Sequence, residues 1–191
     1  MDKIINNPAV QTDKTGNLLV MYERLFNDIK NMPVTYFEIG VFHGGSLIWA
    51  NNYFTHPESK IYGMDKCLSN VPYENHNKII LLECNQNDGD KLQEYGKTLG
   101  KFDIVIDDGS HMAKETMNCF INLWPYLHNG GWYIIEDWGA CYSTYKDAGN
   151  PYLGMDNIIS NILLSTREYG ISGIEIILGG KEGTYAAFKK R

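Results

Sequence analysis

The sequence has no long apolar run and few cysteines. No stretch of its 191 residues approaches the roughly 20 consecutive apolar residues of a membrane span, so we expect no membrane partner. The first eight residues lack the apolar core of a secretory signal peptide, which favours a cytoplasmic location. The cysteines are widely spaced and form no C-x-x-C pair: Cys67, Cys84, Cys119 and Cys141. We therefore expect reduced thiols, with neither a disulfide framework nor a zinc site.

The chain also lacks an excess of basic residues. Its 17 Lys and Arg against 23 Asp and Glu give a formal net charge of -6, which argues against nucleic acid as a main partner. The length and the 43% hydrophobic content are those of an ordinary globular domain. We expect a single domain over residues 1–191, with residues 1–16 as a flexible arm.

Short apolar runs alternate with segments of helical periodicity. The expected strands cover residues 35–40, 60–65, 78–84, 102–107, 132–137, 173–178 and 184–189. The expected helices cover residues 18–32, a segment ending near 54, and 88–99, 113–127 and 155–169, with residues 129–131 as the stop signal of the fourth. This order predicts an α/β fold, a doubly wound, mostly parallel, Rossmann-like seven-stranded sheet with helices on both faces and a C-terminal antiparallel hairpin.

Two acidic pairs end two of the expected strands. Asp107 and Asp108 close the run 102–106, and Glu136 and Asp137 close the run 132–135. Because neighbouring parallel strands lie about 4.8 Å apart, these carboxylates can meet, and a fold tolerates their repulsion when a cation neutralises them. His111 adds a titratable base three residues after Asp108. The pattern favours a divalent-metal site with a general base, against the alternative of a strand-ending turn and a helix-start histidine.

A glycine-containing turn follows the first expected strand. Its spacing from Glu38 through Gly40 to Gly44 is E-x-G-x-x-x-G-G, which differs from the G-x-G-x-x-G fingerprint of dinucleotide binding. A carboxylate at Glu38 would repel pyrophosphate but could pair with a cationic amino-acid group. Asp65 ends the second strand, where an acid typically accepts hydrogen bonds from ribose hydroxyls. S-adenosylmethionine fits this combination; the alternatives are a packing turn and an N-cap aspartate.

These segments resemble class I S-adenosylmethionine-dependent methyltransferases. More narrowly, they resemble the metal-dependent O-methyltransferases of macrolide sugars and the related cephalosporin-hydroxylase-like group. The matching segments are residues 12–14, 37–47, 61–65, 85–88, 106–111 and 134–137. Residues 16–19 lack the histidine often found in the family, so the sequence leaves open whether the N-terminal segment contributes to the active site.

The resemblance implies a role for each matching residue. Glu38, Gly40 and Gly44 would frame the methionine part of the cofactor, Asp65 would hold the ribose, and Gln86 would line the adenine side. The remaining implied cofactor-binding residues are Val41, Phe42, Ser46 and Asp107, the last either facing the cofactor or supporting its loop. The implied magnesium ligands are Asp108, Glu136 and Asp137. His111 would be the general base, acting with Asp108.

The expected function is Mg²⁺-dependent transfer of a methyl group from S-adenosylmethionine to a hydroxyl of a sugar or glycosylated small molecule. Chelating two vicinal hydroxyls on the ion would lower the hydroxyl pKa, and a catechol-like diol could use the same chemistry. The alternatives are an NAD-type oxidoreductase and a cofactor-binding relative without methyltransferase activity. Acceptor specificity is expected in residues 1–16 and 138–154, where Trp138, Tyr142 and Tyr145 could cover a sugar ring. Relatives commonly assemble, so a homo-oligomer is compatible with the resemblance.

Overall fold

The computed structural model describes residues 12, 14, 16–71, 78–142, 153–178 and 183–191. Seven strands form one sheet in the order β3-β2-β1-β4-β5-β7-β6, and the first five run parallel. The two C-terminal strands form the antiparallel hairpin and complete the sheet. The strands are β1 (Thr35–Ile39), β2 (Lys60–Asp65), β3 (Ile79–Glu83), β4 (Phe102–Asp107), β5 (Leu127–Glu136), β6 (Ile171–Ile177) and β7 (Tyr185–Lys190). The predicted doubly wound fold is confirmed.

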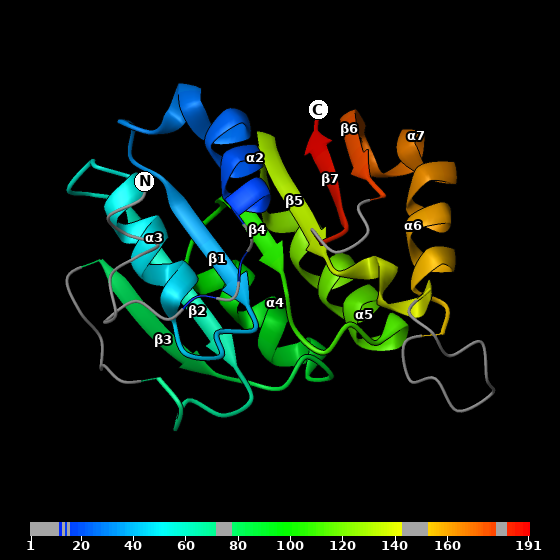
Figure 1. Ribbon diagram of the computed structural model, residues 1–191, viewed down its shortest axis with the longest axis horizontal. Helices are drawn as coiled ribbons and strands as arrows, with labels where there is room; N and C mark the ends of the chain where they lie inside the picture. Colours follow the sequence, from blue (N-terminus) through cyan, green and yellow to red (C-terminus); the bar gives the residue numbers. More distant parts are fainter. Residues whose placement is uncertain (1–11, 13, 15, 72–77, 143–152, 179–182) are drawn as a thin grey trace.

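Helices cover both faces of the sheet. They are α2 (Gly16–Phe26), α3 (Gly45–Tyr53), α4 (Gly89–Thr98), α5 (Ala113–Leu123), α6 (Met155–Leu164) and α7 (Thr166–Tyr169). The 3₁₀ helices of the described residues are η1 (Asn27–Ile29), η2 (Trp124–Tyr126) and η3 (Trp138–Tyr142). In Figure 1, α2 and α3 lie on one face, with α4 and α5 on the other. Two apolar cores, one on each face of the sheet, join these layers.

Side-chain alternation along the strands decides where the strand-end acids point. On β1, Tyr36 packs into the core under α2 and α3 while Phe37 packs into the core under α4 and α5. Because the period of a strand is two residues, Glu38 follows Tyr36 to the α2–α3 face. By the same rule Glu136 points to that face, and Asp107 points to the opposite one. The acids that share a strand end are thereby separated.

The predicted C-terminal end of the helix over residues 113–127 is wrong. Helix α5 ends at Leu123, and the short η2 turn contains Pro125, which cannot donate a backbone hydrogen bond. Strand β5 then begins at Leu127, so residues 129–131 lie inside the strand instead of stopping a helix. Gly130 has φ 83°, and the β4–β5 register shifts between Phe102 and Ile104. The glycines that predict a turn therefore belong to an irregular part of the strand pair.

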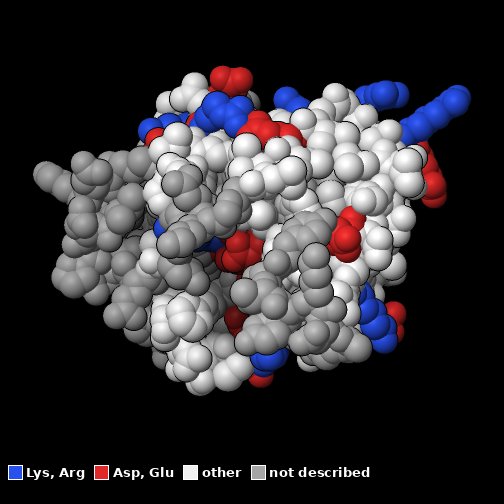
Figure 2. Space-filling view, turned by 45° about the vertical axis from the view of Figure 1, so that its right-hand side comes forward, with Lys and Arg blue, Asp and Glu red and all other residues white. Residues whose placement is uncertain are grey.

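The last helices, the cysteines and the surface charge can also be compared with the expectations from the sequence. The helix expected over 155–169 is interrupted at Ser165 into α6 and α7. All four cysteines are free thiols, as expected. In the part of the chain that the structure describes, no helix combines the length and the apolar character needed to cross a membrane. Figure 2 shows basic and acidic side chains sharing one face of the molecule, with Lys and Arg mainly near its upper rim.

Two expectations depend on residues that are only partly described. Of residues 1–16, only Thr12, Lys14 and Gly16 belong to the described part, so the expected arm lies largely outside it. The single domain over residues 1–191 stays a prediction.

Candidate active site

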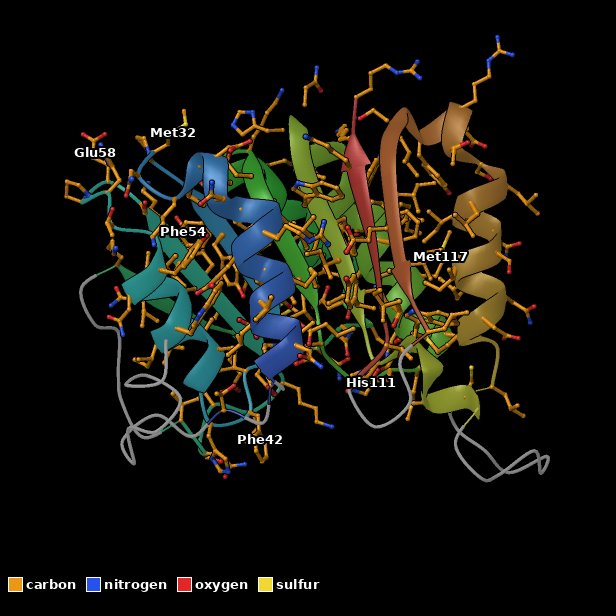
Figure 3. All side chains as sticks on the ribbon, turned by 45° about the horizontal axis from the view of Figure 1, so that its top comes forward. Met32, Phe42, Phe54, Glu58, His111 and Met117 are labelled. Carbon is orange, nitrogen blue, oxygen red and sulfur yellow. The ribbon has the colours of Figure 1, made fainter. Side chains whose placement is uncertain are left out.

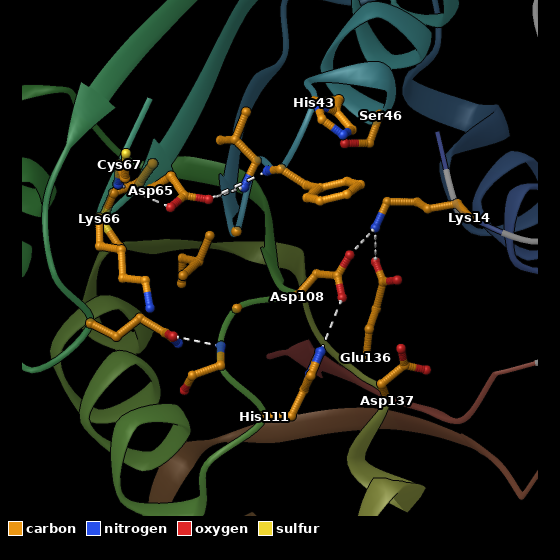
Figure 4. Close-up of a pocket in the computed structure, with 18 of the residues that line it drawn as sticks. Lys14, His43, Ser46, Asp65, Lys66, Cys67, Asp108, His111, Glu136 and Asp137 are labelled. Carbon is orange, nitrogen blue, oxygen red and sulfur yellow. Dashed lines mark hydrogen bonds and ion pairs between the residues drawn. The ribbon is translucent and has the colours of Figure 1, made fainter. Parts of the chain in front are cut away.

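A cavity of about 500 Å³ opens where the carboxyl ends of β1, β2, β4 and β5 converge. The loops that follow these strands supply most of its lining, and α2 contributes Leu18. Figure 4 shows the polar side chains of these loops facing a common space. Parallel sheets bind ligands at this edge, since the strand order reverses there. The sequence predicted this location.

Glycines bring two of the loops into contact. Gly40 follows β1 with φ 87°, a backbone conformation that residues other than glycine rarely adopt. A Cβ at Gly40 would lie 2.0 Å from the carbonyl oxygen of Asp108, so the β1–α3 loop can touch the β4–α5 loop because Gly40 has no side chain. Gly44, with φ 76°, is the N-cap residue of α3. Gly40 lines the cavity together with Val41, Phe42 and Ser46.

Asp65 organises the cofactor loop as well as lining the cavity. Its Oδ2 accepts hydrogen bonds from the backbone N–H groups of Val41 at 2.8 Å and Phe42 at 3.3 Å. Its Oδ1 accepts one from the N–H of Cys67 at 3.1 Å. The carboxylate therefore ties the end of β2 to the glycine turn. Oδ1 accepts only the one hydrogen bond and keeps a further lone pair, so a hydroxyl donor in the cavity can still reach it.

Glu38 is fully buried and is absent from the cavity lining. Its oxygens accept hydrogen bonds from Ser46 Oγ at 2.6 Å and from the Tyr36 hydroxyl at 2.8 Å. The ammonium of Lys14 lies 3.5 Å from its Oε1. Burial raises the pKa of Glu38 in spite of these partners. The sequence led us to expect that a cationic group of the ligand would pair with Glu38, whereas in the structure Lys14 of the protein itself is the cation beside it.

Three of the four acids of the two pairs lie at the cavity, Asp108, Glu136 and Asp137, and they divide into two groups. Asp108, His111 and Asp137 offer ligand atoms that all lie within 4.8 Å of one another. His111 Nε2 is 3.9 Å from Asp108 Oδ1 (Figure 4). Glu136 also lines the cavity, but its Oε1 accepts hydrogen bonds from Lys14 at 2.7 Å and from the Tyr22 hydroxyl. Asp107 belongs to neither group.

Lys14 is the residue that sequence reasoning missed. Its Nζ lies 2.7 Å from Asp108 Oδ2 and 2.7 Å from Glu136 Oε1, and its side chain is 2% exposed. Burial opposes the charge, but the carboxylates of Glu136, Asp108 and Glu38 outweigh it and raise the pKa of Lys14 well above its usual value. The only signal for it was its place in the matching segment 12–14, to which no role had been given.

The carboxylates around Lys14 are held under electrostatic stress. Burial, followed by repulsion from Asp108, raises the pKa of Glu136 to about 8. The same two causes raise the pKa of Asp137. Acids whose charged forms are destabilised in this way attract cations, and a divalent ion among oxygen ligands would relieve the repulsion. The donor set of Asp108, Asp137 and the nearby Glu136 fits Mg²⁺.

Asp107 and Gln86 form a buried support beneath the cavity. The Gln86 amide donates to Asp107 Oδ1 at 3.1 Å and accepts from the backbone N–H of Ser110 at 2.7 Å. The Tyr133 hydroxyl donates to Asp107 Oδ2 at 3.3 Å. Asp107 is 2% exposed and absent from the lining, whereas Gln86 lines the cavity. The pair therefore holds the loop that carries Asp108 and His111.

Three residues other than glycine have positive φ in the described part of the chain. They are Phe42 at 49°, His111 at 56° and Asp137 at 48°, and all three line the cavity. Figure 3 places the labelled Phe42 and His111 at the same end of the sheet. Such conformations cost free energy and persist where the surrounding structure imposes them, typically at functional sites.

The remaining predicted aromatic residues are placed only in part. Trp138 is buried in the apolar core under α4 and α5 and is absent from the lining. The side chain of Tyr142 and all of Tyr145 lie outside the described residues, as does most of the segment 138–154. His43 lines the cavity, where its ring centroid is 3.9 Å from that of Phe42.

Comparison with known proteins agrees with this geometry. A family described as a methyltransferase domain matches residues 37–138, more than half of the chain. Mycinamicin VI 2''-O-methyltransferase of Micromonospora griseorubida is 35% identical over 138 residues, which are 68% of this chain and 34% of that protein. A second relative, 8-demethyl-8-(2-methoxy-alpha-L-rhamnosyl)-tetracenomycin-C 3'-O-methyltransferase of Streptomyces olivaceus, is 36% identical over 136 residues, with 67% and 34% covered.

Solved structures give the same result. MycE methyltransferase from the mycinamycin biosynthetic pathway, in complex with Mg and SAH, superposes with a TM-score of 0.71 and 30% identity over 90% of this chain and 48% of that one. An O-methyltransferase from Bacillus cereus in complex with SAH shares the fold, with a TM-score of 0.64 at 18% identity over 97% and 85%. The chain spans about a third of the length of the curated relatives it matches. The matched region contains the glycine turn and both acidic pairs, and the chain belongs to the methyltransferase-domain family.

Proposed function

We propose that this protein transfers a methyl group from S-adenosylmethionine to a hydroxyl of a sugar or glycosylated small molecule, with a divalent ion such as Mg²⁺. One observation carries the proposal. His111 lies with the carboxylates of Asp108 and Asp137 in the same cavity as the glycine turn. A base, an oxygen-rich cation site and a nucleoside-sized cavity are the three parts that such a reaction needs.

The cofactor half of the cavity is proposed from its donors and its shape. The β1–α3 loop, from Gly40 to Ser46, would surround the amino-acid part, and Asp65 would accept hydrogen bonds from the ribose hydroxyls. When bound, S-adenosylmethionine supplies an activated methyl group and a neutral thioether leaving group. Glu38 lies behind this loop and would act on the ligand through Ser46, since its own oxygens face that hydroxyl and Lys14.

The acceptor half is proposed to act by orientation and proton transfer. Asp108, Asp137 and the Glu136 oxygen that Lys14 does not bond would hold Mg²⁺, which when bound would lower the pKa of a chelated hydroxyl. His111 accepts the hydroxyl proton at Nε2 while the oxygen gains the methyl group, and Asp108 stabilises the resulting imidazolium from 3.9 Å. Holding the reactants in line accounts for much of the remaining rate enhancement.

The acceptor class is proposed from the relatives. The matched proteins named above are O-methyltransferases of mycinamicin and tetracenomycin compounds, and one MycE structure contains Mycinamycin VI. We extend to this chain only the shared chemistry, a hydroxyl on a glycosidic sugar. A homo-oligomeric state, a cytoplasmic location and the absence of nucleic-acid and membrane partners stay predictions.

Calorimetry and a methyl-transfer assay test the proposal. We expect S-adenosylhomocysteine to bind the protein and NAD not to bind. Radiolabelled methyl transfer to a panel of glycosides should require Mg²⁺ and stop in a chelator. Asp108→Asn should abolish metal-dependent turnover while S-adenosylhomocysteine affinity changes little. Exposed Asp90 on α4 provides the matched control, since Asp90→Asn should leave turnover unchanged. NAD binding without S-adenosylhomocysteine binding would replace the proposal by the oxidoreductase alternative.

A further inference from the structure

The acidic cluster contains a cation of its own. Lys14 is the only buried basic side chain among the residues that the structure describes. It reaches the cluster from the segment ahead of α2, whereas its partners Asp108 and Glu136 stand 94 and 122 residues later. The Lys14 ammonium also lies 5.9 Å from the ring centre of Tyr22, whose hydroxyl donates to Glu136.

The Lys14 ammonium donates a hydrogen bond to one oxygen of each of two carboxylates. Lys14 bonds Asp108 through Oδ2, which leaves Oδ1 on the side of His111. It bonds Glu136 through Oε1. The second oxygen of Asp108, Oδ1, is thereby left on the side of the position that Asp137 and His111 share. Lys14 therefore fixes which oxygen of Asp108 a metal ion would meet.

Charge balance explains why a buried lysine is needed. Glu38 and Glu136 are 0% and 3% exposed, and an uncompensated buried carboxylate is strongly destabilising. When Glu38, Asp108 and Glu136 are all ionised, one ammonium leaves the cluster negative, and a divalent ion is attracted because it stabilises these ionised forms. Yet the ammonium occupies the space between Asp108 and Glu136, and it repels any ion that approaches from that side.

We propose that Lys14 is the resident counter-cation of this site, which holds Asp108 and Glu136 in place and confines a divalent ion to the outer position beside Asp137. Lys14 is thus a positioning residue. The part of this inference that concerns the ion rests on the proposed function. The part that concerns the buried carboxylates does not, because it applies to the protein in the absence of metal, cofactor and acceptor.

The variant Lys14→Met tests both parts. In a chelator, its melting temperature should fall by about 6–20 °C, since removing one partner of a buried ion pair costs several kcal/mol in a chain of this size. Once no ammonium lies between Asp108 and Glu136, Mn²⁺ should bind at least about tenfold more tightly by calorimetry. It should also restore part of the lost melting temperature. Exposed Lys114, outside the cavity lining, is the matched control: Lys114→Met should change neither quantity appreciably.

A double variant separates charge compensation from loss of packing. Lys14→Met/Glu136→Gln removes one positive and one negative charge, so it should recover much of the melting temperature lost in Lys14→Met. If Lys14→Met cannot be purified, folding of the double variant carries the same test. An unchanged melting temperature in Lys14→Met, weaker or equal Mn²⁺ binding, or a double variant no more stable than the single one would each overturn the proposal. Failure of methyl transfer alone would overturn the proposed function and leave the melting results to decide the role of Lys14.

Discussion

Adjacent aspartates in this protein have different surroundings because they leave β4 in opposite directions. Asp107 points into the layer under α5, where Gln86 and Tyr133 donate to it. Asp108, one residue later, faces the cavity and Lys14. The same residue type is therefore a buried support at one position and a candidate metal ligand at the next. Strand geometry makes this division.

At the residue scale, His111 offers a direct test of the chemistry. His111→Ala should lower turnover by roughly 10²–10⁴-fold, the usual effect of losing a general base, because among the described residues no other imidazole lies within the Asp108–Asp137 group. Initial rates at saturating S-adenosylmethionine measure the change. Exposed His128, at the start of β5, serves as the control, and His128→Ala should keep the full rate. A near-normal rate in His111→Ala would make His111 a structural residue.

At the scale of elements, the site depends on how closely two strand ends approach. Gly40→Ala should cause severe loss of stability, because the new Cβ would meet the Asp108 carbonyl at 2.0 Å in addition to the strain of φ 87°. Gly100→Ala is the matched control, with φ 92° and no atom within 4 Å of the new Cβ. We expect about 1–2 kcal/mol for the control, from backbone strain alone, and clearly more for Gly40→Ala by urea unfolding. Equal losses would show that the contact between the loops contributes nothing.

The loop between β4 and α5 is a second element whose position can be tested. Gln86 bonds the Ser110 N–H, and a Cβ at Gly109 would lie 2.4 Å from Gln86 Oε1, so the amide packs directly against this loop. We expect Gln86→Leu to lower kcat more than it raises the KM for S-adenosylmethionine, because the loop carries Asp108 and His111. Steady-state kinetics with varied cofactor separate the two. A change confined to KM would instead indicate the adenine contact expected from the sequence.

At the scale of the whole molecule, burial of the acids makes folding stability depend on pH. Burial raises the pKa of Asp107 to about 8 from an ordinary value of 3.8. The folded protein therefore binds a proton that the unfolded chain releases, and this contribution to stability is full below about pH 4 and lost as the pH rises through 8. In a chelator, the free energy of unfolding should fall between pH 5 and pH 8.

The variant Asp107→Asn identifies the group responsible. Its side chain is neutral at every pH, so its stability relative to the wild type should increase steadily as the pH rises. Urea unfolding at pH 5 and at pH 8 measures this difference. If the difference between the two proteins is the same at both values, Asp107 does not carry the proton.

The sequence by itself determined the sheet, its carboxyl edge and most of the cavity. Alternating periodicities predict the succession of strands and helices along the chain. The residues at strand ends, such as Gly40, Asp65 and Asp108, lie at the cavity because parallel strands end together. The sequence also predicted that the acidic pairs need a cation. These features follow from local patterns, since each depends on residues within one strand and its adjoining turn.

Only the tertiary structure decided which groups face one another. It directed Glu38 and Asp107 away from the cavity, placed residues 129–131 inside β5, and brought Lys14 to acids more than 90 residues away. No local pattern encodes these outcomes, because they depend on which face of the sheet each side chain meets and on how α2 and the residues before it cross that face. Lys14 is visible in the sequence as an ordinary lysine, and only the folded chain brings its ammonium to Asp108 and Glu136.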